Sequence, residues 1–352
     1  MNFWIIFLTL FLYLIILRIN FYYKLSLNLL FILLYYIFIL TNFLHFFILY
    51  EIVFIFIIFT IILLGYSYER LIDLYLIMFY SFLFSSPVII IFILFDYVFL
   101  IKNWLIYSFL MTIFLVFSFI VKFPIFGFHY WLPVAHVEAS TLGSILLAGI
   151  LLKLGCIGIF YIVRYNNFII KFHWLSIRTV IVILIILNLR DLKIIIAYSS
   201  VAHITIVFYI LILGWRIGKI GALIIILYHG FISPLIFWLV GLLAWYKTRS
   251  LIVTKYIIFS YFFLLIIFFL IILNIAFPPF IGFLSEICIF KSLIINSRIL
   301  FIFILTILFS CYYNIYLFWA FNGVIGWIFK INFYGVELFI FIFFVLFLNF
   351  NY

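Results

Sequence analysis

Charged residues are scarce in this chain of 352 residues. Lys, Arg, Asp and Glu make up 8% of it, whereas 72% is hydrophobic and the mean hydropathy is +1.57. A soluble domain has about 25% charged residues, so the composition excludes an ordinary water-soluble fold. Runs of about 20 apolar residues in a helix cross the ~30 Å hydrocarbon core of a bilayer. The sequence therefore predicts a membrane protein with many spans.

Cysteine is also rare, and the motifs of common cofactor sites are missing. The three cysteines, Cys156, Cys288 and Cys311, lie far apart in apolar stretches. Structural zinc and iron–sulfur centres need several thiolate or imidazole ligands at set spacings. Phosphate-binding glycine loops, dinucleotide fingerprints and nucleophile elbows do not occur either. We expect this chain to bind no metal, NADH or flavin.

Clusters of basic residues are missing too, although the net charge is +11. Scattered Lys and Arg at helix ends set membrane orientation and meet anionic lipids, so nucleic acid is not an expected partner. The N-terminus has no basic region or cleavage site of a signal peptide. Phe, Ile and Tyr are abundant where Ala and Gly are scarce. Codons rich in A and T produce this bias, which is typical of organelle genes.

Charges, prolines and polar clusters divide the sequence into about twelve predicted helical spans. The linkers are short, so we predict a single all-α transmembrane domain over residues 1–352. The predicted spans are 3–17, 26–40, 43–64, 74–95, 104–132, 139–163, 177–189, 193–213, 220–245, 256–295, 299–320 and 336–350.

Two of these spans are interrupted by proline. The first contains FPIFGF at residues 123–128, and the second contains FPPFIGF at residues 277–283. Proline removes a backbone donor and clashes with the preceding turn, so each helix should break there. Broken helices at matching positions in two halves mark transport sites in many membrane proteins. The alternative is two unrelated proline kinks.

Four ionisable residues lie inside or beside apolar spans. Lys153 and Glu51 are in mid-span, Lys122 adjoins the first break, and Glu286 follows the second. A charge at the bilayer centre costs about 2.5–3.5 kcal/mol, so each residue is a candidate for function. The alternatives are side chains that snorkel to the interface, or structural ion pairs. For Glu286, the nearby Lys291 is a possible local partner.

Buried carboxyl and ammonium groups suit proton transfer because desolvation disfavours the charged form of each. A carboxylate near a lysine restores the lysine charge, so movement between Glu51 and Lys122 could load or discharge the lysine. Histidine relays protons near neutral pH. His203 and His229 lie in apolar spans between the two breaks. Each is a candidate relay or, alternatively, a hydrogen-bond partner between helices.

The segment between Val121 and Ala139 reads VKFPIFGFHYWLPVAHVEA and leads to LLKLG at residues 151–155. It resembles the signature of chain 4 of respiratory NADH:ubiquinone oxidoreductase (complex I), an antiporter-like family. The resemblance covers about residues 25–320, although Val134 and Ser140 replace a common lysine and proline. Other matching pieces are Tyr50-Glu51, Glu69-Arg70, Asp191-Leu192-Lys193, Ala197 to Ser200, His229-Gly230, and Pro278-Pro279 with Glu286.

This resemblance implies two inverted five-helix repeats, about 26–164 and 177–320, each with a broken helix. It implies a carboxylate at Glu51 coupled to Lys122, a central Lys153, and an outlet carboxylate at Glu286. His203 and His229 would lie between Lys153 and Glu286. Few spans precede Glu51, so the chain is expected to be shortened at its N-terminus relative to the family.

The resemblance also implies a proton-translocating role without a redox centre in this chain. Energy would come from electron transfer in other subunits, which hold FMN, iron–sulfur clusters and ubiquinone. Expected partners are the neighbouring antiporter-like subunits and lipids including cardiolipin, in the mitochondrial inner membrane. The alternatives are an Mrp-type cation/proton antiporter subunit and a structural subunit that has lost pumping.

Overall fold

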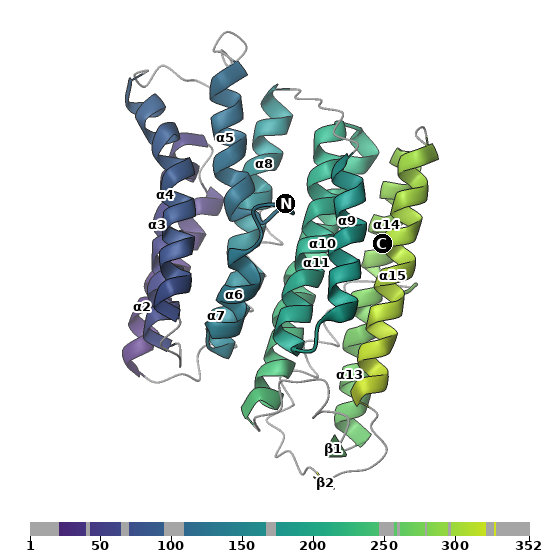
Figure 1. Cartoon of the computed structure of the whole chain (residues 1–352). Coiled ribbons are helices and arrows are strands. Elements are labelled where there is room, and N and C mark those ends of the chain that lie inside the picture. Colours follow the sequence, from purple (N-terminus) through teal and green to yellow (C-terminus); the bar gives the residue numbers. More distant parts are fainter. Residues whose placement is uncertain are drawn as a thin grey trace.

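The chain folds into a bundle of long helices in the computed structural model (Figure 1). The predicted spans 3–17 and 336–350 lie outside the described residues. The structure describes residues 21–39, 43–64, 70–94, 109–166, 174–245, 257–258, 261–278, 280–294, 297–321 and 327–328.

The first half of the chain forms seven described α-helices and one π-helix, and the second half forms six described α-helices and two short strands. The elements of the first half are α2 (Phe21–Ile39), α3 (Phe43–Leu64), α4 (Arg70–Leu94), α5 (Phe109–Lys122), α6 (Trp131–Glu138), α7 (Thr141–Leu146), the π-helix η2 (Leu147–Leu151) and α8 (Leu152–Asn166). Those of the second half are α9 (Trp174–Asn188), α10 (Leu192–Leu213), α11 (Arg216–Trp245), β1 (Ile257–Ile258), α13 (Tyr261–Ile275), α14 (Ile281–Leu293), α15 (Ser297–Phe321) and β2 (Trp327–Ile328). The two strands pair in parallel, with Ile257 opposite Trp327.

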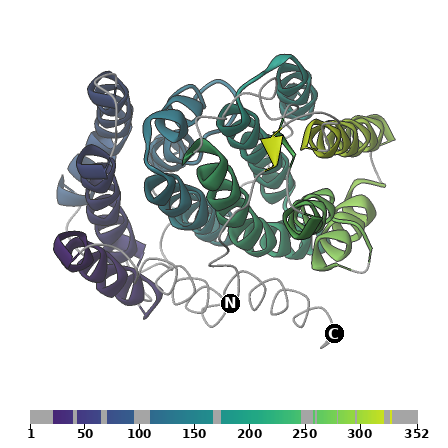
Figure 2. The same cartoon turned by 90° about the horizontal axis from the view of Figure 1, so that it is seen from below.

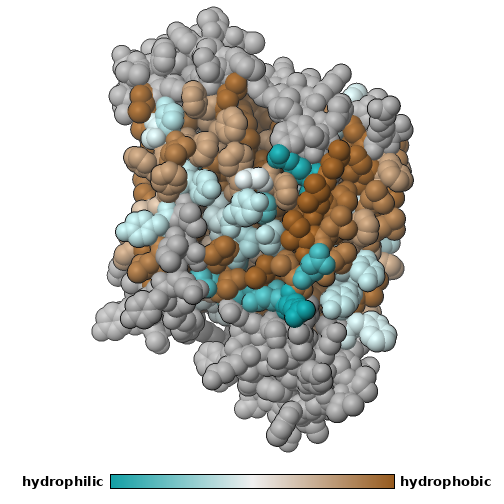
Figure 3. All heavy atoms as spheres, in the orientation of Figure 1, coloured by the Kyte–Doolittle hydropathy of each residue, from teal (hydrophilic) through white to brown (hydrophobic). Residues whose placement is uncertain are grey.

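The predicted all-α membrane fold is confirmed, although the number of twelve spans is not. In the described part, five helical segments are long and apolar enough to cross a membrane, and shorter apolar helices accompany them. The five are Phe43–Ile62, Thr141–Val163, Leu192–Leu213, Arg216–Gly241 and Ile299–Trp319. Much of the face shown in Figure 3 is apolar between its grey ends, as expected for contact with lipid or other membrane subunits.

The first broken helix is confirmed between α5 and α6. Pro124 follows the end of α5, and Gly127 has a φ of +112°, a conformation that favours glycine. Side chains pair with backbone oxygens around the break, as the membrane interior requires. The Trp131 indole donates to the Val121 carbonyl at 2.9 Å, and Arg178 from α9 donates to the Phe126 carbonyl at 2.8 Å.

The helix after this break differs from the prediction. We expected one span to end at residue 132 and the next to begin at 139, but α6 occupies Trp131–Glu138. Pro133 does not prevent this helix, because it lies in the first turn, where a backbone N–H has no helical partner. The serine that replaces the family's proline, Ser140, caps α7 by accepting a hydrogen bond from the Gly143 N–H at 3.2 Å.

The second break is confirmed between α13 and α14. It starts at Ala276, one residue before the predicted segment, and Ala276 has a φ of +59°. This left-handed conformation is uncommon for a residue with a Cβ atom. The Tyr228 hydroxyl of α11 donates to the Leu273 carbonyl near the end of α13. A side chain from a neighbouring helix therefore supports the second break, as at the first.

Helices α10 and α11 lie in the centre of the bundle and contact both halves of the chain. They pack against α6, α7, η2 and α8 on one side, and against α9, α13 and α14 on the other. Figure 2 shows α2–α4 at one edge and α15 at the opposite edge. The two broken helices run in opposite directions in Figure 1, where α6 lies below α5 but α14 lies above α13. This direction agrees with inverted repeats, whose boundaries at 26–164 and 177–320 stay a prediction.

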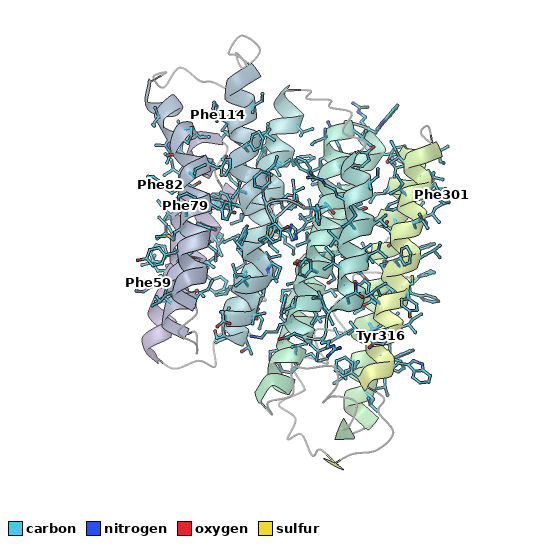
Figure 4. All side chains as sticks on the ribbon, viewed as in Figure 1. Phe59, Phe79, Phe82, Phe114, Phe301 and Tyr316 are labelled. Carbon is cyan, nitrogen blue, oxygen red and sulfur yellow. The ribbon has the colours of Figure 1, made fainter. Side chains whose placement is uncertain are left out.

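The outer surface of the bundle carries aromatic side chains. Figure 4 shows Phe59, Phe79 and Phe82 at the edge formed by α3 and α4, and Phe301 at the α15 edge. Phe82 is 74% exposed and Phe301 is 62% exposed. Exposure of this extent is unfavourable in water, so we expect lipid or other membrane subunits to cover both edges.

Candidate functional site

Glu51 and Lys122 form an ion pair between α3 and the end of α5. The break after α5 makes Lys122 the last residue of that helix, where a cation is favoured by the helix dipole. Lys122 is only 1% exposed, and the Glu51 side chain is 17% exposed. The structure therefore brings these two residues together, although 71 positions separate them in the sequence.

Aromatic rings enclose the Lys122 ammonium beside this carboxylate. Its Nζ lies 4.9 Å from the centre of the Tyr50 ring and 4.7 Å from that of Phe54. Both rings come from α3, one residue before and three residues after Glu51, so the same helical face supplies them. A cation over an aromatic face is stabilised by about 0.5–2 kcal/mol. The lysine charge therefore has partners other than the carboxylate.

Lys153 lies just after the π-helix η2, which the sequence did not predict. Its buried Nζ donates to the Ala148 carbonyl of η2 at 2.6 Å. The same atom lies 3.0 Å from His229 Nδ1 and 3.5 Å from Ser233 Oγ, both on α11. The lysine therefore bonds inside the bundle, which does not fit the alternative that it snorkels to the interface. π-Helical turns are frequent at functional sites.

The two predicted histidines lie together beside Lys153. The His203 ring on α10 and the His229 ring on α11 have centroids 5.3 Å apart. His229 is buried, and His203 is partly buried. Lys153, His229 and His203 thus form one continuous group of ionisable side chains across the middle of the bundle.

A cavity of about 20 Å³ extends this group to Glu286 on α14. A cavity needs about 10–15 Å³ and two to four polar partners to hold a water molecule. Its polar lining side chains are His203, Tyr228, His229, Asn274, Ser285 and Glu286. Lys291, the local partner that the alternative interpretation of Glu286 offered, is exposed, and the described residues show no ion pair between it and Glu286.

The structure does not join the Glu51–Lys122 pair to Lys153. Within the described ranges, no hydrogen bond or ion pair connects these two groups. Tyr50 and Phe123 pack against Gly155, two residues after Lys153, where a Cβ would be 3.2 Å from the Tyr50 hydroxyl. Any proton exchange between the groups would need water or movement of side chains.

Sequence reasoning missed several polar residues near this group. His136 on α6 is fully buried and stacks on Phe237 with 4.3 Å between the ring centroids. Lys193 is buried and donates to the Val137 and Ala139 carbonyls at the end of α6. The sequence placed His136 only within a family motif and left the role of Lys193 open. The one sequence signal that could have identified His136 was a histidine among the apolar residues that precede it.

Most of the chain matches a known family, and two relatives illustrate the match. The family described as NADH:quinone oxidoreductase/Mrp antiporter, TM, matches residues 17–310. NADH-ubiquinone oxidoreductase chain 4 of Locusta migratoria is 33% identical over 273 residues, covering 72% of this chain and 61% of the relative. The same-named chain of Albinaria caerulea is 33% identical over 308 residues, covering 81% and 70%. The chain thus spans about six-tenths of the locust relative's length.

Solved structures share the fold at low sequence identity. A chain of respiratory complex I from Thermus thermophilus has a TM-score of 0.79 and 18% identity, covering 98% of this chain and 77% of that chain. A chain of the Mrp complex from Dietzia sp. has a TM-score of 0.75 and 16% identity, covering 87% and 61%. With the family match over most of the sequence, these likenesses lead to one conclusion: this chain belongs to the NADH:quinone oxidoreductase/Mrp antiporter transmembrane family.

Proposed function

We propose that this chain is a proton-translocating membrane subunit of a respiratory NADH:ubiquinone oxidoreductase, in the mitochondrial inner membrane. The observation that carries the proposal is the buried group formed by Lys153, His229 and His203, which a water-sized cavity extends to Glu286. The similarity to proteins named NADH-ubiquinone oxidoreductase chain 4 favours this complex over other users of the fold.

In this proposal, Lys153 holds a proton in the middle of the bundle and passes it to His229. The 3.0 Å contact between Lys153 Nζ and His229 Nδ1 is short enough for direct transfer. His203 and the cavity then lead to Glu286, which releases the proton. Each step moves one proton between two groups and leaves no covalent intermediate.

Glu51 and Lys122 would control the charge felt by Lys153. When their ion pair is closed, the two charges largely cancel at a distance. When it opens, the Lys122 charge is uncovered inside the first half of the bundle and disfavours a second cation nearby. Opening of the pair would therefore drive the proton from Lys153 toward the second half.

The chain itself would carry no redox centre in this proposal. Electron transfer from NADH to ubiquinone through FMN and iron–sulfur clusters would occur in other subunits. The neighbouring antiporter-like subunits and lipids such as cardiolipin would cover the exposed aromatic edges.

Native electrophoresis of mildly solubilised membranes tests the assignment. The gel is stained for NADH dehydrogenase activity, and this chain is located in it by mass spectrometry. We expect the chain in the large active band. A chain that migrates apart from all NADH dehydrogenase activity would overturn the assignment to this complex.

An Mrp-type cation/proton antiporter subunit is the second candidate, because the matching family and one solved structure with this fold include Mrp proteins. The chain is purified, reconstituted in liposomes and tested for cation-dependent proton movement. Antiport by the purified chain would favour this candidate, and its absence together with migration in the active band favours the first.

A further inference from the structure

A second cavity lies between α10, α11, α13 and α15. Its volume is about 30 Å³, and its lining is apolar except for four side chains. These are Ser199, Asn274, Tyr313 and Asn314. The volume exceeds the ~10–15 Å³ that a water molecule needs, and the four side chains supply enough polar partners.

Asn274 lines both this cavity and the cavity that holds His203, His229 and Glu286. It lies on the last turn of α13, next to the second break. Its amide donates to Asn314 Oδ1 at 2.8 Å and lies 3.4 Å from the Tyr313 hydroxyl. The two cavities therefore meet at one amide side chain, which a hydrogen bond to α15 holds in place.

The lining residues extend the second cavity from the middle of the bundle to one of its ends. Leu192 is the first residue of α10, and Phe321 is the last residue of α15. Val240 lies near the end of α11. In Figure 1, the first turn of α10 and the last turns of α11 and α15 lie at the same lower end of the bundle.

The polar residues need an explanation because apolar ones would fill this space at lower cost. Burying an amide or hydroxyl without full hydrogen bonding costs at least about 1–3 kcal/mol. Asn314 and Tyr313 are only 1% and 3% exposed, so neither faces lipid or solvent. Hydrogen bonds among these side chains use part of their capacity, as do the bonds that Asn314 donates to the Ser310 carbonyl and Ser199 donates to the Ile196 carbonyl. Water in the cavity would use the remaining acceptor and donor positions.

We propose that Asn274 joins two hydrated cavities and so forms a water branch from the Glu286 cavity to the end of the bundle where α10 begins and α15 ends. The use of this branch by protons rests on the proposed function, but its hydration does not. Asn274 acts as a positioning residue, because its hydrogen bond to Asn314 orders the junction. The competing explanation is a dry packing network among Asn274, Tyr313 and Asn314.

Thiol accessibility to silver ion, a small water-soluble probe, tests the branch in the assembled complex in sealed membrane vesicles. Cys156, Cys288 and Cys311 are first replaced by serine, and single cysteines are introduced as Ser199→Cys and Asn314→Cys. Leu273→Cys is the matched control, because Leu273 is 1% exposed, adjoins Asn274 and lines neither cavity. Silver is added to one side of the membrane at a time. Unreacted thiols of this chain are then counted by mass spectrometry after unfolding.

We expect silver to react with Ser199→Cys and Asn314→Cys from one side at least about tenfold faster than with Leu273→Cys. The reason is that a thiol reacts faster in contact with water than in apolar packing. Rates as slow as the Leu273→Cys rate from both sides would overturn the proposal. Ser199→Cys changes a single atom, so it carries the test if the asparagine variant fails to assemble.

A second step tests the junction itself. Ser285→Cys places a thiol in the Glu286 cavity. We expect silver added on the side of the branch to reach it with Asn274 present, and at least about tenfold more slowly after Asn274→Leu. Equal rates with and without Asn274→Leu would contradict a junction at this residue. The labelling needs no NADH oxidation, so its outcome is independent of whether the complex pumps protons through this chain.

Discussion

Among the single residues, Glu51 and Lys122 form a buried ion pair, an interaction that contributes little to stability and therefore needs another explanation. Replacing a buried ion pair with apolar side chains is often neutral or stabilising, whereas removing one partner costs about 3–5 kcal/mol. Tyr50 and Phe54 keep a cation in this position tolerable when the carboxylate moves away. The pair is therefore suited to open and close.

Glu51→Gln should destabilise the subunit, because it leaves the Lys122 charge buried with only aromatic partners. We expect the subunit to dissociate from the solubilised complex at a lower temperature. The expected loss of stability is on the order of 3 kcal/mol. Thermal scans followed by native electrophoresis measure this.

The double variant Glu51→Leu with Lys122→Met separates stability from function. It should regain much of the thermal stability, because no unpaired charge remains, but proton translocation should stay low. Normal translocation in this double variant would show that the pair serves only to hold α3 against α5.

Much of this site could be predicted from residues alone, and the failures have physical causes. A lysine or glutamate within an apolar span is conspicuous because its cost is large, so Glu51, Lys122, Lys153 and Glu286 could be identified. The partner of Lys153 could not, because contact with His229 depends on how α8 packs against α11. Asn274 carries no charge, so its position in an apolar run gave only a weak signal.

At the scale of the elements, the broken helices explain how the site is built. Each proline segment ends a helix at mid-bundle, and neighbouring side chains then satisfy the backbone groups around it. The sequence predicted both breaks from proline. It did not predict the π-helix η2, because a π-helical turn has no distinct composition, nor the short helix α6.

The contact between α5 and α8 depends on Gly158. A Cβ atom at this position would lie 2.2 Å from the Phe119 ring, which is fully buried and cannot move aside freely. Gly158→Ala should therefore push α5 away from α8 and reduce the amount of assembled complex. Overpacking of this kind costs about 1–3 kcal/mol. Quantitative native electrophoresis measures the assembled fraction.

Phe119→Leu should partly rescue Gly158→Ala, because the smaller side chain leaves space for the new methyl group. The single Phe119→Leu variant serves as the control for the loss of aromatic contacts with Tyr50. Equal amounts of assembled complex in Gly158→Ala and in the wild type would show that α5 and α8 are not in close contact here.

At the scale of the whole molecule, α10 and α11 hold the halves together and carry the central residues. His203 and His229 lie on these two helices, and Lys153 reaches across from the first half. The arrangement places ionisable groups along the middle of the bundle, while the edges at α4 and α15 are apolar. A subunit that passes charge through its interior and packs sideways against others would have this organisation.

Photo-crosslinking residues at the two edges test the lateral contacts. A crosslinking amino acid replaces Phe82 on α4 or Phe301 on α15, and Phe237, which is fully buried, is the control position. In the assembled complex, we expect at least one edge to form adducts with another membrane polypeptide and the control to form only internal ones. Adducts with lipid alone at both edges would contradict contact with neighbouring subunits there.

Proton translocation by the complex that carries Lys153→Ala tests whether Lys153 lies on the path of the translocated proton. Protons moved and NADH oxidised are measured together in sealed vesicles, with Lys291→Ala as the control because Lys291 is an exposed lysine. Positioned proton-transfer groups contribute about 10²–10⁴-fold, so translocation through this chain should fall at least about tenfold in Lys153→Ala and stay normal in Lys291→Ala. An unchanged number of protons per NADH at a normal rate in Lys153→Ala would show that Lys153 does not carry the translocated proton.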